Sequence, residues 1–249
     1  MNWIKDFIPT MKKNISETFG TEKESKIPEG LWKSCDKCGS ILYIPELKKN
    51  SYVCSKCTHH FKINVQERIE ITFDENTYSD LNEPEKFNDY LKFKDTKKYK
   101  DRFQEAQTKT DSDEALSIGT GKIKGRDVVV AIFEFDFLGG SMGAVVGKRF
   151  GKAVDYAVEH GSPLIVFSTS GGARMQESMI SLFQMGKTAA AVKRLKNKKI
   201  PFLSVLVDPC YGGVTASLAM LGDLILAEPK ARIGFSGKRV IQDLSLIHI

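Results

Sequence analysis

Two glycine-rich turns carry the residues best suited to chemistry. The first, Ser170–Glu177, reads Ser-Gly-Gly-Ala-Arg-Met-Gln-Glu and follows an apolar run over 163–167. The second, Pro209–Gly213, follows another apolar run over 202–208. A strand that ends in paired glycines and continues as a helix leaves backbone N–H groups at the helix N-terminus, where they suit an anion or a developing oxyanion. We predict that the two turns form one active site.

Two Cys-x-x-Cys motifs predict a metal site, with Cys35 and Cys38 in the first and Cys54 and Cys57 in the second. Each motif brings two thiolates to one ion, and two motifs complete a tetrahedral shell. Four thiolates leave no position for a catalytic water, so we expect one structural zinc ion, Zn2+, rather than free thiols. The neighbouring residues 59–60 are histidines, which we expect at the surface and not on the metal.

The charge of the N-terminal region argues against a nucleic-acid site in this zinc ribbon. Residues 1–62 carry a formal charge of +4, from eleven lysines against seven acidic residues. Four thiolates and one zinc ion reduce this charge to +2, which is little for a surface that binds phosphates. Nucleic-acid binding therefore remains a weakly supported alternative.

The chain as a whole is typical of a globular protein. Hydrophobic residues make up 41% of the sequence, which supports a sizeable core, and the net charge of +6 permits an anionic ligand without requiring nucleic acid. No apolar run approaches the roughly 18 residues of a membrane span. The N-terminus lacks the apolar core of a signal peptide, so we expect a cytoplasmic protein without membrane contact.

The elements around the turns predict a largely parallel sheet with crossover helices. We expect strands over 127–135, 164–168, 202–208, 223–227 and 231–235, and helices over 145–160, from 177 to about 199 and over 214–220. In the ribbon, we expect short strands over 41–44 and 51–53. Residues 64–117 are charged and have a mostly helical pattern. Within them, Lys94–Arg102 alternates in charge sign and is expected to form a solvated helix face, with contact to the phosphates of a nucleotide-like ligand as the alternative.

Two other motifs lack residues that the sites they resemble require. Gly186–Thr188 resembles the end of a phosphate-binding loop, but Ser181 stands where that loop needs a glycine. Ser170 suggests a serine hydrolase, yet position 168 lacks the glycine of a nucleophile elbow. No histidine lies between 160 and 248 to serve as its base.

Oxyanion donors without an evident proton-transfer side chain suit a reaction that passes through an enolate. The main task of the protein is then to stabilise negative charge on a thioester-like oxygen. Loss of one such donor typically raises the barrier by ~3–4 kcal/mol.

Taken together, these motifs resemble the β subunit of the bacterial and plastid-type acetyl-CoA carboxylase carboxyltransferase family. The resemblance covers about residues 25–242 and lies in the zinc ribbon, in Phe93–Arg102, and in the core motifs Phe137–Gly143, Ser170–Glu177, Asp208–Val214, Met220–Asp223 and Ala227–Ala231. It implies an α/β fold, the crotonase (ClpP-like) superhelix of ββα units, preceded by an N-terminal four-cysteine zinc ribbon.

The resemblance also implies an activity and an assembly. The family transfers the carboxyl group of carboxybiotin, held on the biotin carboxyl carrier protein, to acetyl-CoA and so forms malonyl-CoA, the first committed step of fatty-acid synthesis. The expected partners are a homologous carboxyltransferase α subunit in an α2β2 assembly, the carrier protein and the ATP-binding biotin carboxylase. Biotin is thus the second cofactor, and it accepts the proton that leaves acetyl-CoA.

The resemblance maps onto particular residues of this chain. The oxyanion donors are expected to be the backbone N–H groups of Gly172, Ala173, Gly212 and Gly213. Contacts with the CoA ester are expected at Gly139, Gly140, Ser141, Gly171 and Arg174. Arg174 and Glu177, three residues apart, are also expected to form a structural ion pair.

The resemblance sets the expected domain boundaries as well. They are a polar arm over 1–30, the zinc ribbon over 31–62 and an incomplete carboxyltransferase core over 63–243. We expect 244–249 to be a non-native tail, because the pattern stops at about Gln242 and these residues match one reading frame of a sequencing-transposon end. Cys210 stands where the family has a small hydroxyl residue, and we expect it to be a packing residue and not a nucleophile.

Two alternatives to this function remain. The same fold could serve a crotonase-type hydratase or thioesterase, although hydratases place carboxylates beside their glycine turns and Val214–Ser217 offers none. The second alternative is a zinc-ribbon nucleic-acid module attached to an inactive core.

Overall fold

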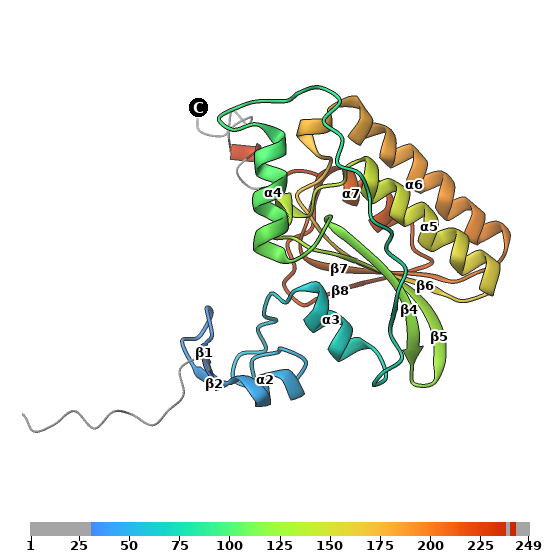
Figure 1. Cartoon of the computed structure of the whole chain (residues 1–249). Coiled ribbons are helices and arrows are strands. Elements are labelled where there is room, and N and C mark those ends of the chain that lie inside the picture. The colour runs from blue at the N-terminus through green and yellow to red at the C-terminus, as the bar shows by residue number, and fades with distance from the viewer. Residues whose placement is uncertain (1–30, 238–239, 243–249) are drawn as a thin grey trace, which may run out of the picture.

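A six-stranded mixed sheet organises the structure. The computed structural model describes residues 31–237 and 240–242, and Figure 1 shows how their elements are arranged. The strands lie in the order β3-β4-β5-β6-β7-β8. They span Ser79–Asp80 (β3), Leu116–Ile123 (β4), Arg126–Phe133 (β5), Leu164–Ser170 (β6), Phe202–Cys210 (β7) and Leu224–Ala227 (β8). The pairs from β3 to β5 are antiparallel, whereas those from β5 to β8 are parallel.

Helices cover both faces of this sheet. Helices α5 (Ala144–His160) and α6 (Met179–Asn197) lie side by side on one face, and α3 (Val65–Thr72) lies on the other (Figure 1). The remaining core helices are α4 (Tyr99–Thr110), α7 (Gly212–Thr215) and the single turns η1 (Leu138–Gly140), η2 (Met175–Glu177) and η3 (Leu218–Met220). The α/β class is confirmed. Among the described residues, no helix has both the length and the apolar content that crossing a membrane requires.

Strand β5 explains why the sheet is covered on both faces. Its residues are largely β-branched, and all six from Val128 to Phe133 are buried. Side chains of a strand alternate between the two faces. Val129 and Ala131 accordingly join the main core under α5, whereas Val128 and Val130 pack with Ile69 of α3.

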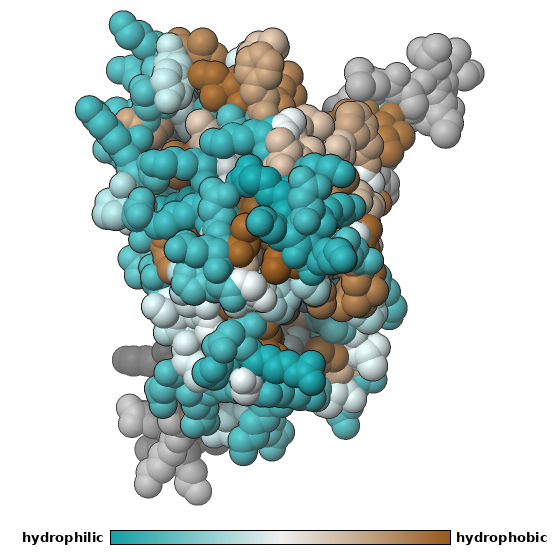
Figure 2. All heavy atoms as spheres, turned by 90° about the vertical axis from the view of Figure 1, so that its right-hand side faces the viewer, coloured by the Kyte–Doolittle hydropathy of each residue, from teal (hydrophilic) through white to brown (hydrophobic). Residues whose placement is uncertain are grey.

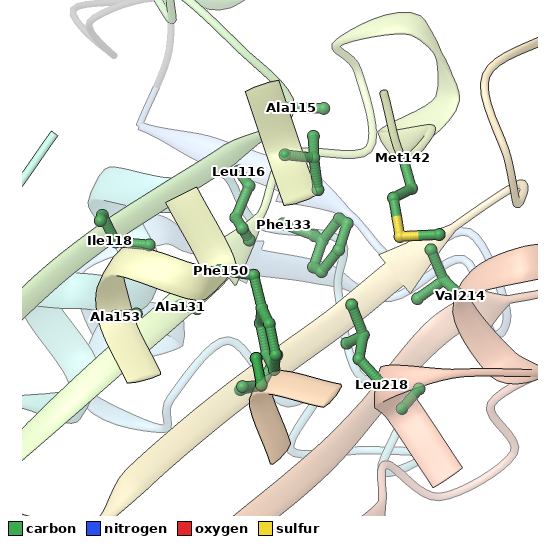
Figure 3. Packing of buried hydrophobic residues seen from close by; sticks show 14 of the residues in the cluster. Ala115, Leu116, Ile118, Ala131, Phe133, Met142, Phe150, Ala153, Val214 and Leu218 are labelled. Atoms are coloured by element: carbon green, nitrogen blue, oxygen red, sulfur yellow. The ribbon is translucent and has the colours of Figure 1, made fainter. Parts of the chain in front are cut away.

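The main core lies between the sheet and α5. Phe150 of α5 is fully buried there, and its ring lies 6.3 Å from that of Phe202 at the start of β7. Figure 3 shows Phe150, Leu116, Phe133 and Leu218 converging in this region. The apolar face of α5 thereby holds together the strands that lead to the glycine-rich turns.

The ribbon is joined to this core through α3. Its elements are β1 (Trp32–Ser34), the antiparallel β2 (Ile41–Tyr43) and α2 (Ile44–Lys49). Helix α3 begins with a capping box between Asn64 and Glu67. From α3, Arg68 pairs with Glu228 beyond β8 at 2.9 Å and lies over the ring of Phe167. These contacts fix the orientation of α3 on the core.

The charged stretch 64–117 differs most from its prediction. Outside α3 and α4 it is largely non-helical, and it contains β3 and the start of β4. The two glycines of β4 weakened the strand pattern. The ring of Tyr78 lies where a side chain at Gly119 would lie, and Phe73 does the same at Gly121. Such close packing by another side chain is a usual reason for glycine inside a strand.

Four further predictions are wrong in detail. The sheet is mixed rather than largely parallel. Residues 231–235 do not form a strand: Ile233 makes a single bridge to Cys210. The expected helix 214–220 is broken between α7 and η3, where the Ser217 hydroxyl donates to the carbonyl oxygen of Gly213 at 2.5 Å. In the ribbon, 51–53 makes only a bridge from Val53 to His60. The predicted arm 1–30 and tail 244–249 lie outside the described residues.

We predict that Phe150→Ala lowers the free energy of unfolding by ~3–5 kcal/mol, because it removes a fully buried ring from the core and leaves a cavity. Urea unfolding of the full chain measures this change. Glu159→Ala, an exposed position on the same helix, is the matched control and should alter stability by no more than ~0.5 kcal/mol. Equal stabilities for the two variants would show that α5 does not hold the core.

Candidate functional site

Three glycine-rich turns, numbered from here on in chain order, are the first turn (Phe137–Gly143), the second turn (Ser170–Glu177) and the third turn (Pro209–Gly213). They meet at the carboxyl ends of β5, β6 and β7. Gly172 and Gly212 have positive φ angles of 122° and 61°. A Cβ atom on Gly212 would lie 2.9 Å from the Cα of Gly172, which is closer than real Cβ contacts allow. The first turn packs equally closely, because a Cβ on Gly140 would clash with the carbonyl oxygen of Thr169. Glycine is thus required where the three backbones touch.

The predicted donors separate into two that are occupied and two that are free. The Gly172 N–H donates to the Ser170 hydroxyl at 2.9 Å, and the Gly212 N–H donates to the Phe235 carbonyl oxygen at 2.9 Å. In the part of the chain that the structure describes, the N–H groups of Ala173 and Gly213 have no acceptor. Buried backbone N–H groups are rarely left unpaired.

These two free groups lie together. A Cβ atom on Gly213 would lie 3.2 Å from the backbone nitrogen of Ala173. Two adjacent N–H donors at the ends of neighbouring parallel strands can hold one oxygen that carries negative charge. The sequence prediction of four donors is therefore narrowed to Ala173 and Gly213.

The residues expected at the CoA ester lie on the first turn and beside it. Gly139 accepts from the Gly171 N–H at 2.8 Å, and the Gly172 carbonyl oxygen accepts from the Met142 N–H at 2.8 Å. Gly171 is exposed, and Gly139 and Ser141 are half-buried. The turn thus borders the donor pair, and its role in binding remains a prediction.

Arg174 differs from the others, because its side chain is fully buried within the protein. Its guanidinium forms a bidentate ion pair with Glu114, which is 1% exposed, and also donates to the Ser141 carbonyl oxygen at 2.8 Å. Burial by itself disfavours the charged guanidinium, but the adjacent Glu114 raises the pKa of Arg174 above its ordinary value. The expected contact of this side chain with substrate is therefore not supported, since the protein itself engages the guanidinium.

The ion pair expected between Arg174 and Glu177 is present at 3.3 Å, and it belongs to a larger buried network. Tyr99 donates to Glu177 at 2.7 Å, and the other oxygen of that carboxylate accepts from the Ala144 N–H at 2.6 Å. Glu177 thus caps α5 from a distant turn, at the helix end where a negative charge is favourable. The network joins the first two turns to α4 and α5.

Sequence reasoning missed Glu114 and Tyr99. Tyr99 lies inside the stretch 94–102 that was interpreted as a solvated face, yet it is 1% exposed and begins α4. Two of the charged residues around it, Arg102 and Asp95, pair with each other, and Lys97 pairs with Glu105. In the sequence, the position of an aromatic residue within a run of charged residues indicates that Tyr99 is buried.

Ser170 and Cys210 are not placed as nucleophiles. The Ser170 hydroxyl is fully buried and hydrogen-bonded to backbone groups. Cys210 is also fully buried, and burial raises the pKa of its thiol to about 11. The Cys210 N–H donates to the carbonyl oxygen of Arg232, so the segment after β8 supports the third turn.

The four ribbon cysteines match a zinc site. Their sulfur atoms all lie within 4.8 Å of one another, with 3.6 Å between Cys35 and Cys57 and 3.9 Å between Cys38 and Cys54. A tetrahedron with zinc–sulfur bonds of about 2.3 Å has edges of about 3.8 Å. The four thiolates thus fit a closed structural zinc site.

Comparison with known proteins gives the family. The model of the carboxyl transferase domain matches residues 62–245, and that of the acetyl-CoA carboxylase zinc finger domain matches residues 32–57. The chain therefore belongs to the carboxyl transferase domain family. A zinc finger of this kind followed by this domain is the architecture of the acetyl-CoA carboxylase carboxyltransferase β subunit.

Solved structures show a similar fold. Transcarboxylase 12S with methylmalonyl-coenzyme A and methylmalonic acid bound is 27% identical, with a TM-score of 0.56 over 74% of this chain and 32% of that one. The Pseudomonas malonate decarboxylase MdcD-MdcE hetero-dimer is 24% identical, with a TM-score of 0.54 over 73% of this chain and 68% of that one. The β subunit of P. aeruginosa geranyl-CoA carboxylase is 17% identical, with a TM-score of 0.53 over 78% of this chain and 32% of that one. This chain spans about a third of the transcarboxylase chain. The crotonase-like fold is confirmed.

We predict that Cys54→Ser removes the zinc and unfolds the ribbon, because the few buried residues beside the site cannot hold it alone. Elemental analysis should find one zinc per wild-type chain and much less in the variant, and limited proteolysis should cut within 31–62. Cys210→Ser, which changes the buried core cysteine, should retain its zinc. A Cys54→Ser protein with full zinc content would disprove this assignment of ligands.

Proposed function

We propose that this chain is the carboxyltransferase component that forms malonyl-CoA from acetyl-CoA. The observation that carries the proposal is the pair of unpaired N–H groups at Ala173 and Gly213. A thioester whose α-carbon loses a proton places negative charge on its carbonyl oxygen, and the two N–H groups stabilise that charge. Carboxybiotin on a carrier protein would supply the carboxyl group. Its nitrogen–carbon bond would break as the new carbon–carbon bond forms at the α-carbon, and the freed biotin nitrogen would take the proton.

The buried network sets the direction of these donors. Arg174 holds the Ser141 carbonyl oxygen, and the adjacent Met142 N–H holds the Gly172 carbonyl oxygen. A trans peptide points its C=O and N–H groups in opposite directions. The Ala173 N–H, on the same peptide as that carbonyl group, therefore points away from the first turn. Preorganised donors of this kind need no rearrangement during the reaction.

A hydratase is less well supported. Its carboxylates would have to lie beside the donors with room to exchange protons. The buried carboxylates of the network, Glu114 and Glu177, are both engaged by Arg174, and Glu177 also accepts from Tyr99 and Ala144. These two carboxylates therefore stabilise the structure around the site.

We further propose that the chain acts within an assembly containing a carboxyltransferase α subunit, the biotin carboxyl carrier protein and the ATP-consuming biotin carboxylase. Fatty-acid synthesis in the cytoplasm would use the product. Carboxyltransferase relatives act in multi-subunit complexes. Figure 2 shows brown, apolar patches at the top and along the right-hand edge of the surface that it displays.

The first half of helix α6 supports a partner subunit, because its polarity is inverted, whereas Ala191, Val192 and Leu195 of the second half are buried in the core. Its buried face carries Ser181, Gln184 and Thr188, whereas Leu182 and Phe183 are 50% and 65% exposed. A solvated helix normally shows the opposite arrangement. Since α6 follows the turn that carries Ala173, a subunit covering it lies next to the donor pair.

We predict that Gly213→Ala abolishes carboxyltransfer, because its methyl group would lie 3.2 Å from the Ala173 nitrogen and displace the oxyanion. The assay combines the full chain, its α partner, free biotin and malonyl-CoA, and it measures acetyl-CoA formed in the reverse direction. A loss of at least ~100-fold in kcat is expected from a blocked donor pair. Gly151→Ala, where an added Cβ meets nothing within 4 Å, is the control and should keep its activity.

Two results would contradict these assignments. A wild-type complex that forms no acetyl-CoA rejects the proposed function. Full activity in Gly213→Ala rejects the oxyanion assignment.

We predict that Phe183→Glu weakens assembly with the α subunit by ~10-fold or more, because it places a charge at the centre of an apolar contact. Analytical ultracentrifugation of the mixed subunits measures the affinity. Ile41→Glu, at a ribbon position that is 72% exposed, introduces the same charge elsewhere and should assemble normally. Equal affinities for both variants would place the interface away from α6.

A further inference from the structure

The Ser170 hydroxyl lies where the three glycine-rich turns meet. Its oxygen donates to the Gly140 carbonyl oxygen at 2.6 Å and accepts from the Gly172 N–H at 2.9 Å. The carbonyl oxygen of the same residue accepts from the Tyr211 N–H at 2.8 Å. One residue, fully buried, is therefore bonded to all three turns.

Two of these bonds are made by residues that closely precede a free donor along the chain. Gly172 precedes Ala173, so the bond from Ser170 to the Gly172 N–H fixes the peptide that leads into the first donor. Tyr211 is two residues before Gly213 and is held by the Ser170 carbonyl oxygen. The bond to Gly140 holds the first turn against both of these segments.

Ser168 shows that burial of a hydroxyl on this strand does not by itself produce such contacts. It lies two residues earlier in β6 and is also fully buried. Within residues 31–237 and 240–242, its hydroxyl oxygen has no hydrogen-bond partner. The two serines thus match in residue type, strand and burial, and they differ in their hydrogen bonds.

We propose that Ser170 is a positioning residue: its hydroxyl holds Gly172, and with it the Ala173 N–H, against Gly140, and its backbone carbonyl oxygen holds Tyr211, two residues before Gly213. The catalytic role of Ser170 rests on the function proposed above. The hydrogen bonds of Ser170 do not depend on that function. A serine in this place needs no base, because its hydroxyl keeps its proton and only donates a hydrogen bond to the Gly140 carbonyl oxygen. This accounts for a serine beside the donor pair without a histidine near it in the sequence.

The test compares Ser170→Ala with Ser168→Ala in the complete complex. In Ser170→Ala we expect kcat to fall roughly 10- to 100-fold, because small displacements of catalytic groups have effects of this size. The KM for malonyl-CoA should change less than about twofold. Calorimetric titration with acetyl-CoA should give wild-type stoichiometry, which shows that the sites remain folded. Ser168→Ala should match wild type in both constants.

A second readout does not depend on activity. Ser170→Ala removes the acceptor of the Gly172 N–H, so hydrogen–deuterium exchange of the segment 170–174 should be at least about tenfold faster, and Ser168→Ala should leave it unchanged. Ser170→Cys keeps a weaker donor and acceptor and should recover part of kcat and part of the protection. If the alanine variant fails to fold, Ser170→Cys provides the test in its place.

The outcomes separate the two proposals. Wild-type kcat in Ser170→Ala, or a loss matched by lower binding stoichiometry, overturns the positioning role. If the wild-type complex itself has no carboxyltransferase activity, the proposed function fails. Hydrogen–deuterium exchange then tests separately whether Ser170 holds the turns. Unchanged exchange in Ser170→Ala overturns the positioning role.

Discussion

The contact between the backbones of Gly172 and Gly212 is the constraint on which the site depends. No side chain fits between the two turns, and the nearest atoms to an added Cβ on either glycine belong to the backbone of the other turn. Backbone atoms cannot move aside as a flexible side chain can. The parallel strands β6 and β7 must therefore end at matching heights, and the register shift between Ser168 and Ser170 gives this fit. The pair of free donors at Ala173 and Gly213 is a consequence of that contact.

A buried ionic network holds the contact in place at a cost in desolvation. Arg174 has no exposed surface, and its two carboxylate partners are 2% and 6% exposed. Removing one member of such a pair usually costs about 3–5 kcal/mol, although the pair itself contributes little net stability. The network instead makes the arrangement of the turns specific. Because the guanidinium contacts Glu114, Glu177 and Ser141 together, only one arrangement of the first two turns satisfies every group.

The ribbon and the core depend on different physical effects. The core is stabilised by a large buried apolar cluster. The ribbon has a small cluster around Leu47, Tyr52 and Phe61, which is too little for independent stability, so its fold relies on the thiolate site. Helix α3 joins the two, with Ile69 packed on the sheet and Ile71 on the ribbon. The metal site thereby keeps a fixed place relative to the turns.

The sequence by itself determined the features that rest on local chemistry. The zinc ligands follow from the type and spacing of four cysteines. The strands β5, β6 and β7 follow from short β-branched runs, and the turns follow from paired glycines. Tertiary structure alone decided which groups remain free for chemistry. Glu114 lies 60 residues from Arg174 and Tyr99 lies 78 residues from Glu177, so no local pattern links them. In the same way, Gly212 is an occupied donor only because Phe235 folds back onto it, and Ser170 is a structural hydroxyl only because Gly140 lies beside it. Periodicity reports the neighbours of a residue along the chain, whereas the occupancy of a hydrogen bond depends on neighbours in space.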